Sequence, residues 1–331
     1  MFSMLVRSAA WRKFQPFSSL DRVRQVVGLQ AAINPLRAIA RGPLSRPTRA
    51  PRPFAACGRA ARAKRDILVS SEGVSLTALI IDACVAQHTG DRTEQQDRVA
   101  LLPHPKHGGV ALAVLSDGMG GHTGGTLAAQ QVIHTARNNF EQFSPSSESP
   151  QSMLEASLNE AHMLIKASRF INEKEPHSTA VMLLVQPGKL SWAHCGDSRL
   201  YRFRGEQPFF RTVDHSYVEQ LVAGGKITPE QALVHPNRNI LVTSLGGSDK
   251  PKIDFGGTED LQAGDSFLLC SDGLWGYFGD AELGSVLAAH SAREASELLI
   301  SRARTRSQGE GDNVSLAILK LVAAKGRKVA N

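Results

Sequence analysis

Short apolar runs and longer helical patterns follow one another from about residue 76 onward. Apolar runs bounded by glycine or charged residues predict strands at 76–86, 110–115, 179–185, 190–195, 200–204, 266–270 and 314–321. Apolar residues spaced three and four apart predict helices at 125–143, 153–171, 215–223, 229–233, 280–290 and 292–305. The predicted helices fall in pairs between groups of strands. This order favours an α+β fold with layered antiparallel sheets over a doubly wound parallel sheet.

Residues 1–75 lack this regularity. Segment 1–65 contains 14 Lys or Arg residues and a single acidic residue, Asp21, for a net charge of +13. Such a composition cannot bury enough apolar surface to fold. Three origins remain open: a disordered basic arm, an organelle transit peptide, or upstream sequence from a mis-assigned start codon. We expect a disordered extension at 1–75, one large folded domain at 76–323 and a basic tail at 324–331.

The charge of the remaining chain has the opposite sign. Residues 66–331 hold 24 basic and 30 acidic residues, a net charge of −6. A nucleic-acid enzyme usually carries positive charge on its folded body, so no nucleic-acid partner is expected. No apolar run approaches the roughly 20 residues of a membrane span. The four cysteines form no CxxC pair, and Cys195 and Cys270 end apolar runs. We therefore expect buried, reduced thiols in a cytoplasmic protein.

Aspartates stand where predicted strands meet glycine-rich turns. Asp117 and Asp272 each follow a strand within a Ser-Asp-Gly triplet. Asp312 precedes the last strand, with one residue, Asn313, between them. Asp97 and Asp197 lie in two further polar turns. A single Asp-Gly pair usually marks only a turn. Three carboxylates at strand ends of one domain indicate a site.

Carboxylates gathered at the ends of core strands need compensating charge. Without it, burial costs several kcal/mol per ion, and few Lys or Arg residues flank these motifs. Hard divalent cations with oxygen ligands are the natural compensation. An all-carboxylate ligand set favours Mg²⁺ or Mn²⁺ over zinc. Gly118, directly after Asp117, leaves its carbonyl free to approach an ion.

Together these segments resemble the metal-dependent protein phosphatase (PPM) family, the protein phosphatase 2C type, in its bacterial form. The matching motifs occur in family order across residues 84–320: Arg92…Gln96-Asp97, Ser116-Asp-Gly-Met-Gly-Gly-His122, Cys195-Gly-Asp-Ser-Arg-Leu-Tyr201, Thr212-Val-Asp-His-Ser216, His235-Pro-Asn-Arg-Asn239, Leu245-Gly-Gly247, Ser271-Asp-Gly-Leu-Trp275 and Gly311-Asp-Asn313. The resemblance implies a four-layer α-β-β-α sandwich, with two antiparallel sheets flanked by helix pairs. The metals would lie in a cleft at one end.

The resemblance also implies hydrolysis of phosphoserine and phosphothreonine in proteins by a hydroxide that bridges two Mn²⁺ or Mg²⁺ ions. By position, the implied metal ligands are Asp97, Asp117, the Gly118 carbonyl, Asp197, Asp272 and Asp312. Of these, Asp117 would bridge two ions and Asp197 would bind a third. Arg92 would clamp the phosphoryl oxygens, and residues 214–245 would form a flap. The implied partners are phosphoproteins and a cognate eukaryotic-like serine/threonine kinase. A monomer is expected.

Several positions keep more than one interpretation. Met119 stands where eukaryotic relatives have a histidine, so the general acid is open between His122 and water on a third ion. His122 is equally explained as a loop residue packing the glycine turn. Asp197 suits either a ligand role or an ordinary turn. Asp214 and His215 are expected to cap the helix that follows them.

Two other classes of protein fit the sequence less well than a metal-dependent phosphatase does. A nucleotide-binding protein would need the G-x-G-x-x-G fingerprint, which fails at Thr123. A catalytically inactive phosphatase fold would be expected to lack a ligand, and none of the implied ligands is missing. Metal-dependent hydrolysis of p-nitrophenyl phosphate would discriminate among the three.

Overall fold

The computed structural model describes residues 66–67, 79–169 and 175–323. The chain divides into two units, 1–56 and 57–331, and every described residue belongs to the second. Two residues of the predicted extension, Asp66 and Ile67, form a short strand that pairs with residues 79–80. The rest of that extension and the tail at 324–331 lie outside the described residues, so the predicted domain boundaries stay predictions.

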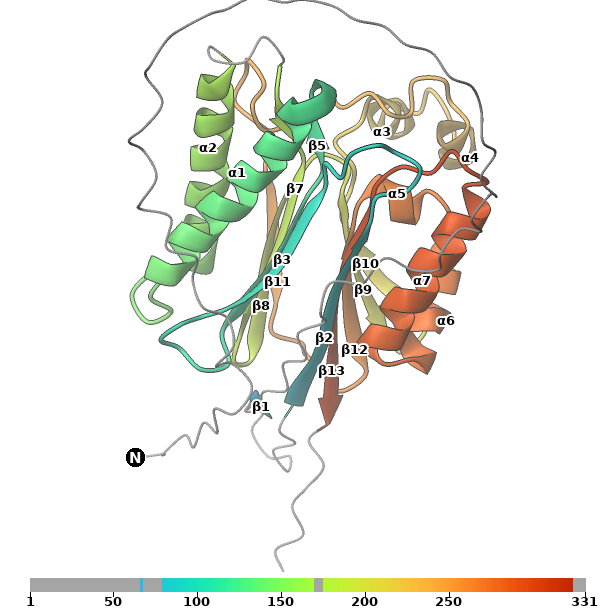
Figure 1. Ribbon diagram of the computed structural model, residues 1–331. Helices are drawn as coiled ribbons and strands as arrows, with labels where there is room; N and C mark the ends of the chain where they lie inside the picture. The colour runs from blue at the N-terminus through green and yellow to red at the C-terminus, as the bar shows by residue number, and fades with distance from the viewer. Residues whose placement is uncertain (1–65, 68–78, 170–174, 324–331) are drawn as a thin grey trace, which may run out of the picture. The chain divides into compact units, whose positions relative to one another are not determined.

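Two antiparallel sheets form the centre of this unit (Figure 1). The six-stranded sheet has the order β1 (Asp66–Ile67), β2 (Leu79–His88), β13 (Val314–Ala323), β12 (Asp265–Cys270), β9 (Arg199–Arg204) and β10 (Gln207–Arg211). The five-stranded sheet has the order β11 (Asp254–Thr258), β8 (Lys189–Cys195), β7 (Ala180–Gln186), β4 (Ala111–Ser116) and β3 (Arg98–Pro103). A small pair joins β5 (Gly118–Met119) to β6 (His177–Ser178).

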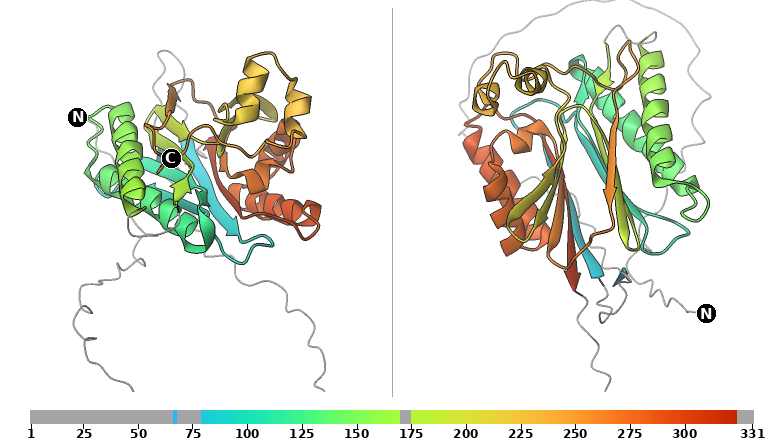
Figure 2. Two further views of the ribbon diagram at one scale, coloured as in Figure 1. Left: turned by 90° about the horizontal axis from the view of Figure 1, so that it is seen from above. Right: turned by 180° about the vertical axis from the view of Figure 1, so that it is seen from behind.

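Helix pairs cover the two outer faces. The helices are α1 (Gly121–Gln142), α2 (Pro150–Ser168), α3 (Tyr217–Ala223), α4 (Pro229–Leu233), α5 (Asp272–Trp275), α6 (Asp280–Ala289) and α7 (Ala292–Arg306). Helices α1 and α2 contact the five-stranded sheet, and α6 and α7 contact the six-stranded sheet. Figure 2 shows the green and red pairs on opposite sides of the strands. The predicted α+β sandwich with flanking helix pairs is confirmed.

Alternation of side chains along the central strands builds three separate cores. On β7, Met182 and Leu184 pack against α1 and α2, whereas Val181 and Leu183 face the other sheet. On β12, Leu268 joins the core under α6 and α7. Successive side chains of a strand point to opposite faces, so a strand covered on both sides must be apolar throughout. The buried free thiols Cys195 and Cys270 belong to these cores, as predicted.

Helix boundaries follow local capping chemistry except at α1. Helix α2 begins at Pro150, earlier than predicted, because Ser149 accepts a hydrogen bond from the Ser152 amide and proline suits the first helical position. Helix α1 begins at Gly121, although glycine disfavours helix interiors. A Cβ at Gly125 would lie 2.5 Å from the Gly118 carbonyl oxygen. Close packing against the Asp-Gly turn therefore explains glycine in this helix.

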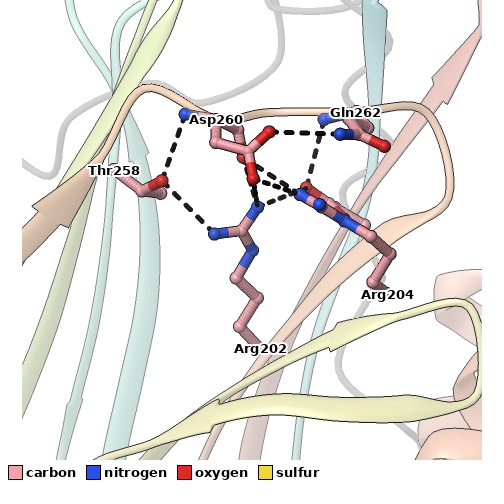
Figure 3. A network of polar contacts seen from close by, with 6 residues as sticks. Arg202, Arg204, Thr258, Asp260 and Gln262 are labelled. Atoms are coloured by element: carbon pink, nitrogen blue, oxygen red, sulfur yellow. Dashed lines mark hydrogen bonds and ion pairs between the residues drawn. The ribbon is translucent and has the colours of Figure 1, made fainter.

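A polar network joins the two sheets along one edge (Figure 3). Arg202 and Arg204 of β9 bind the fully buried Asp265 at 2.8 and 2.9 Å. Arg202 also donates to Thr258 of β11 at 3.3 Å, and Arg204 pairs with Asp260 at 3.0 Å. The network thus compensates a buried carboxylate where β9, β12 and the end of β11 meet.

No helix in the described part of the chain combines the length and apolarity needed to cross a membrane.

Candidate metal centre

The structure brings together all five predicted aspartates. Asp117 lies between β4 and β5, and Asp272 follows β12 as the first residue of α5. Figure 1 shows β5 and α5 at the same end of the two sheets. Burial raises the pKa of Asp117 well above its ordinary value, and four neighbouring carboxylates raise it further: Asp97, Asp272, Asp197 and Asp312. Like charges raise a carboxyl pKa only at short range. The five side chains therefore form one electrostatic unit, called here the aspartate cluster.

Hydrogen bonds from Ser178 of β6 and from Thr179, between β6 and β7, hold the main chain of Asp117. Its amide donates to Thr179 Oγ1 at 3.0 Å, and its carbonyl accepts from the Thr179 amide at 2.9 Å. Ser178 Oγ donates to the same carbonyl at 2.8 Å. With its backbone occupied on this side, Asp117 stands at a set position between β4 and β5.

Gly118 is required by close backbone packing. A Cβ there would lie 2.0 Å from the Gly125 carbonyl oxygen and 2.9 Å from the Gln96 carbonyl oxygen. Any larger residue would separate the Asp-Gly turn from α1 and from the segment that carries Asp97. The turn is therefore compact for a structural reason, and it directly follows Asp117 in the chain.

Asp97 is the most deeply buried member, with 1% of its surface exposed. Burial raises its pKa, the charge of Asp272 adds to this rise, and hydrogen bonds from Ser271 and Ser315 oppose it. Ser271 Oγ donates to Asp97 Oδ2 at 2.8 Å. The groups that hydrogen-bond the Asp97 carboxyl are thus hydroxyl and carboxyl neighbours, whereas the nearby Arg98 guanidinium binds the main-chain carbonyl of Asp97 at 2.7 Å.

Asp272 and Asp312 sit on adjacent segments. Asp272 is the first residue of the short helix α5, where a simple turn was expected. Burial raises its pKa, and Asp312 raises it further. A Cβ at Gly273 would lie 2.0 Å from the Asn313 carbonyl oxygen, so the end of β12 and the start of β13 touch at the site. Strand pairing of β12 with β13 therefore brings the two aspartates together.

Asp197 belongs to the same cluster. It is 9% exposed, and its pKa is raised by burial and then by Asp272 and Asp214. Trp275 Nε1 donates to its carbonyl at 2.9 Å, and the Arg199 guanidinium lies 3.5 Å from the centre of the Trp275 ring. The Gly-Asp-Ser segment is a turn, and its aspartate faces the other carboxylates. Whether it binds an ion belongs to the proposal below.

Arg92 lies at the exposed edge of the cluster. Its Nη2 is 2.7 Å from Asp312 Oδ2, and 63% of its side chain is exposed. The predicted phosphate-binding residue therefore reaches the site. His122 lies in α1, and its side chain is outside the described part of the structure.

Asn313 and Ser271 support the site, although the sequence motifs that contain them predicted no role for either residue. Asn313 accepts from the Gln96 amide at 2.7 Å and donates to the Thr89 and Glu94 carbonyls. It thereby fastens the segment that carries Arg92 and Asp97. Ser271 bonds Asp97 and also accepts from the Ser315 amide at 3.1 Å. The repeated Ser-Asp-Gly triplet was the available signal for Ser271.

The expectation that Asp214 and His215 cap the next helix is wrong. Ser216 caps α3 by accepting from the Glu219 amide. Asp214 instead binds Arg199 through two contacts of 2.8 and 2.7 Å, both buried. His215 bonds Gly196 and Asp254. The buried Asp214 carboxylate and the His215 imidazole bind residues distant in sequence, and the hydroxyl of the next residue, Ser216, caps the helix.

The cluster has the donor set that Mg²⁺ or Mn²⁺ requires. All its side-chain donors are carboxylate oxygens, and the turn adds a carbonyl oxygen. The positive charges that lower the pKa of Asp272 are Arg92 and Arg199, and both are ion-paired with Asp312 and Asp214 respectively. The residues therefore fit a site for divalent cations, which would supply the missing charge.

A separate cavity of about 740 Å³ lies beside α2, β8 and β11. Trp192, Phe255 and Gly256 line it, and none of the predicted site residues does. This cavity is therefore distinct from the aspartate cluster, which is identified by its charge and its hydrogen bonds.

Comparisons with known proteins agree with this geometry. The family model described as "Protein phosphatase 2C" matches residues 86–306. The protein phosphatase PhpP of Streptococcus pneumoniae is 30% identical over 236 residues, which is 70% of this chain and 93% of PhpP.

Solved structures show the same fold. The serine/threonine phosphatase of S. agalactiae matches with a TM-score of 0.67 and 28% identity, covering 72% of this chain and 99% of that one. The catalytic domain of the phosphatase PstP, solved in complex with two manganese ions, matches with a TM-score of 0.62 and 28% identity, covering 74% and 99%. The chain belongs to the protein phosphatase 2C family.

Proposed function

We propose that this protein hydrolyses phosphoserine and phosphothreonine in proteins, using Mn²⁺ or Mg²⁺ held by the aspartate cluster. The observation that carries the proposal is a buried group of five carboxylates whose charges raise one another's pKa values. Support comes from relatives that are named as protein phosphatases, and from the PstP structure with its two manganese ions.

The proposed ligand assignment follows the placement of each residue. Asp117 stands between the other carboxylates and is acted on by all four, which suits a bridging ligand. Its neighbour Gly118 offers a carbonyl, and Asp272 with Asp312 forms the second group. Asp97, which accepts a hydrogen bond from Ser271, would act through metal-bound water, and Asp197, whose carbonyl accepts from Trp275, would help to hold a third ion.

When bound, the ions would supply an activated water and positive charge against the phosphate ester. The chain's own residues do the remaining work. Arg92 offers an exposed guanidinium at the rim of the cluster, where it can bind phosphoryl oxygens in a bidentate manner. Ser271 and Asn313 hold Asp97 and the Arg92 segment in place. Pre-set positions of this kind lower the cost of reaching the transition state.

The substrates proposed are phosphoproteins, including the substrates of a cognate eukaryotic-like serine/threonine kinase. A monomer is proposed because all the candidate ligands come from a single chain.

Metal removal tests the proposal. Hydrolysis of a phosphothreonine peptide should require added Mn²⁺ or Mg²⁺ and stop after treatment with EDTA, because all the proposed donors are oxygen. Asp272→Asn should lose activity at every metal concentration, whereas Asp280→Asn, outside the cluster on α6, should keep it. Full activity after exhaustive chelation would refute the metal mechanism.

A further inference from the structure

His215 joins the flap, residues 214–245, to the centre of the domain. The two ends of the flap meet at this residue. The Val242 amide donates to the His215 carbonyl at 2.9 Å, and Ser216 pairs with Leu241. The side chain of His215 is buried, with 3% of the residue exposed. Any movement of the flap base would therefore act on this imidazole.

The contacts of His215 lead directly to Asp197. The His215 amide donates to the Gly196 carbonyl at 2.8 Å, and the Gly196 amide donates back to His215 Nδ1 at 3.2 Å. Gly196 has φ of +107°, and a Cβ there would lie 2.6 Å from the Thr179 side chain. His215 thus fixes both peptide units of Gly196, the residue that directly precedes Asp197.

Asp254 fixes the imidazole from the other side. Its Oδ2 is 3.0 Å from His215 Nε2. Because the Gly196 amide points its hydrogen at Nδ1, the proton of the neutral ring is on Nε2 and is donated to Asp254. A carboxylate that holds one ring nitrogen sets the orientation of the other. The chain of contacts therefore runs from Asp254 on β11 through His215 to the Gly196–Asp197 turn.

The same place could suggest a transition-metal site. His194 is fully buried, neither of its ring nitrogens has a hydrogen-bond partner among the described residues, and its ring lies 4.5 Å from that of His215. His194, His215 and Asp254 can each bring one ligand atom within 4.8 Å of the others. An ion on His215 Nε2 would, however, move the proton to Nδ1, against the Gly196 amide hydrogen. The hydrogen-bonded arrangement thus favours a positioning role.

We propose that His215 is a positioning residue that couples the flap to cation binding at Asp197. The inference rests on the proposed function, in which Asp197 binds the third ion. Trp275 fixes the carbonyl of Asp197, and His215 fixes the peptide before it, so the two together set the direction of the carboxylate. Coupling between sites is reciprocal. An ion at Asp197 should therefore order the flap, and a substrate held by the flap should tighten that ion.

Two substitutions separate the two ring contacts. His215→Asn places an amide oxygen near the position of Nδ1 and can still accept from Gly196. His215→Gln reaches the position of Nε2 and keeps only the contact with Asp254. His104→Gln is the matched control, because buried His104 also accepts backbone amides at Nδ1 and bonds a carbonyl through Nε2. It follows β3 at the end remote from Asp97.

The measurement is Mn²⁺ binding by calorimetry in the full-length protein, with hydrogen exchange of the flap amides beside it. His215→Gln should weaken the weakest Mn²⁺ about tenfold or more, as loss of an outer-shell partner usually does, and leave the tighter ions nearly unchanged. His215→Asn should weaken it much less. Saturating Mn²⁺ should slow flap exchange in the wild type and in His215→Asn, but not in His215→Gln.

Equal ion affinities in His215→Gln and His104→Gln would overturn the coupling, and so would a uniform weakening of all ions. If His215→Gln fails to fold, Asp254→Ala decides, because it frees the ring without removing it and should weaken only the same ion. A wild type that binds no Mn²⁺ and hydrolyses no phosphopeptide would instead refute the proposed function. KM for the phosphopeptide should rise more than kcat falls in His215→Gln, since in this proposal the flap would contact the substrate outside the reacting group.

Discussion

Asp265 and Asp97 are equally buried, yet their surroundings differ in kind. Asp265, with none of its surface exposed, binds the guanidinium groups of Arg202 and Arg204 at 2.8 and 2.9 Å. Asp97, 1% exposed, accepts from a serine hydroxyl at 2.8 Å and lies among other aspartates, and the nearby Arg98 binds its main-chain carbonyl. A buried charge is costly unless it is paired. Burial therefore serves structure where guanidinium groups bind the carboxylate itself, and marks a site where hydroxyl and carboxyl groups surround it.

The largest effect is expected from Asp117→Asn. Losing the carboxylate that all the others act on should reduce kcat by about a hundredfold or more, since a metal contributes several kcal/mol to the transition state. In the metal-free protein the same substitution should raise the melting temperature, because it removes repulsion from four neighbours. Steady-state kinetics and calorimetry after chelation measure both. Lower stability of the metal-free variant would show that the cluster is not repulsive.

Asp265→Ala tests the structural half of the comparison. Two arginines would lose their buried partner, and breaking such a pair typically costs about 3–5 kcal/mol of unfolding free energy. Urea unfolding measures the loss, while kcat per folded molecule should stay at the wild-type value. The control is Asp260→Ala, on the exposed side of the same network, which should change stability little. A loss of kcat with normal stability would place Asp265 in the active site.

The pH dependence of stability should separate the two carboxylates next. Burial raises the pKa of Asp97 to about 7, above the ordinary value of 3.8. A raised carboxyl pKa means that the folded protein binds the proton more tightly than the unfolded chain does. The metal-free protein should therefore gain stability as pH falls from about 8 to about 5, and no further gain from this group should follow below 3.8. Thermal melts in EDTA should show this slope, and Asp97→Asn should reduce it, while the raised pKa values of Asp117, Asp197 and Asp272 maintain the rest.

The smallest effect is expected from removing residues 1–65. This segment holds the +13 charge and none of the predicted ligands, so kcat/KM on p-nitrophenyl phosphate should change less than about twofold, under 0.5 kcal/mol. Deleting residues 1–70 would also remove β1, which pairs with β2. A lower melting temperature only in the longer deletion would place the boundary between the two. A tenfold loss of kcat/KM in the shorter one would make the segment part of the enzyme.

Much of the fold could be predicted from local pattern. The central strands contain continuous apolar runs, and apolar residues in the long helices repeat every three to four residues, so β4, β7, β12, α2 and α7 lie close to their predicted bounds. Strands β3, β10 and β11 were not predicted. All five residues of β10 are exposed, and β11 contains two glycines, so neither has the apolar pattern of a buried strand. Their pairing comes from neighbouring strands.

The sequence by itself determined the inventory of the site: the order of the aspartates, the glycines beside them and the acidic charge of the body. The tertiary structure decided their partners. Asp214 binds Arg199 instead of capping α3, and His215 holds Gly196. Asn313 binds the carbonyls of Thr89 and Glu94, which lie 224 and 219 positions earlier in the chain. Local pattern records burial and helix or strand period, but a hydrogen bond across such a separation exists only after the sheets have paired. The role of each buried polar residue was therefore set by the fold.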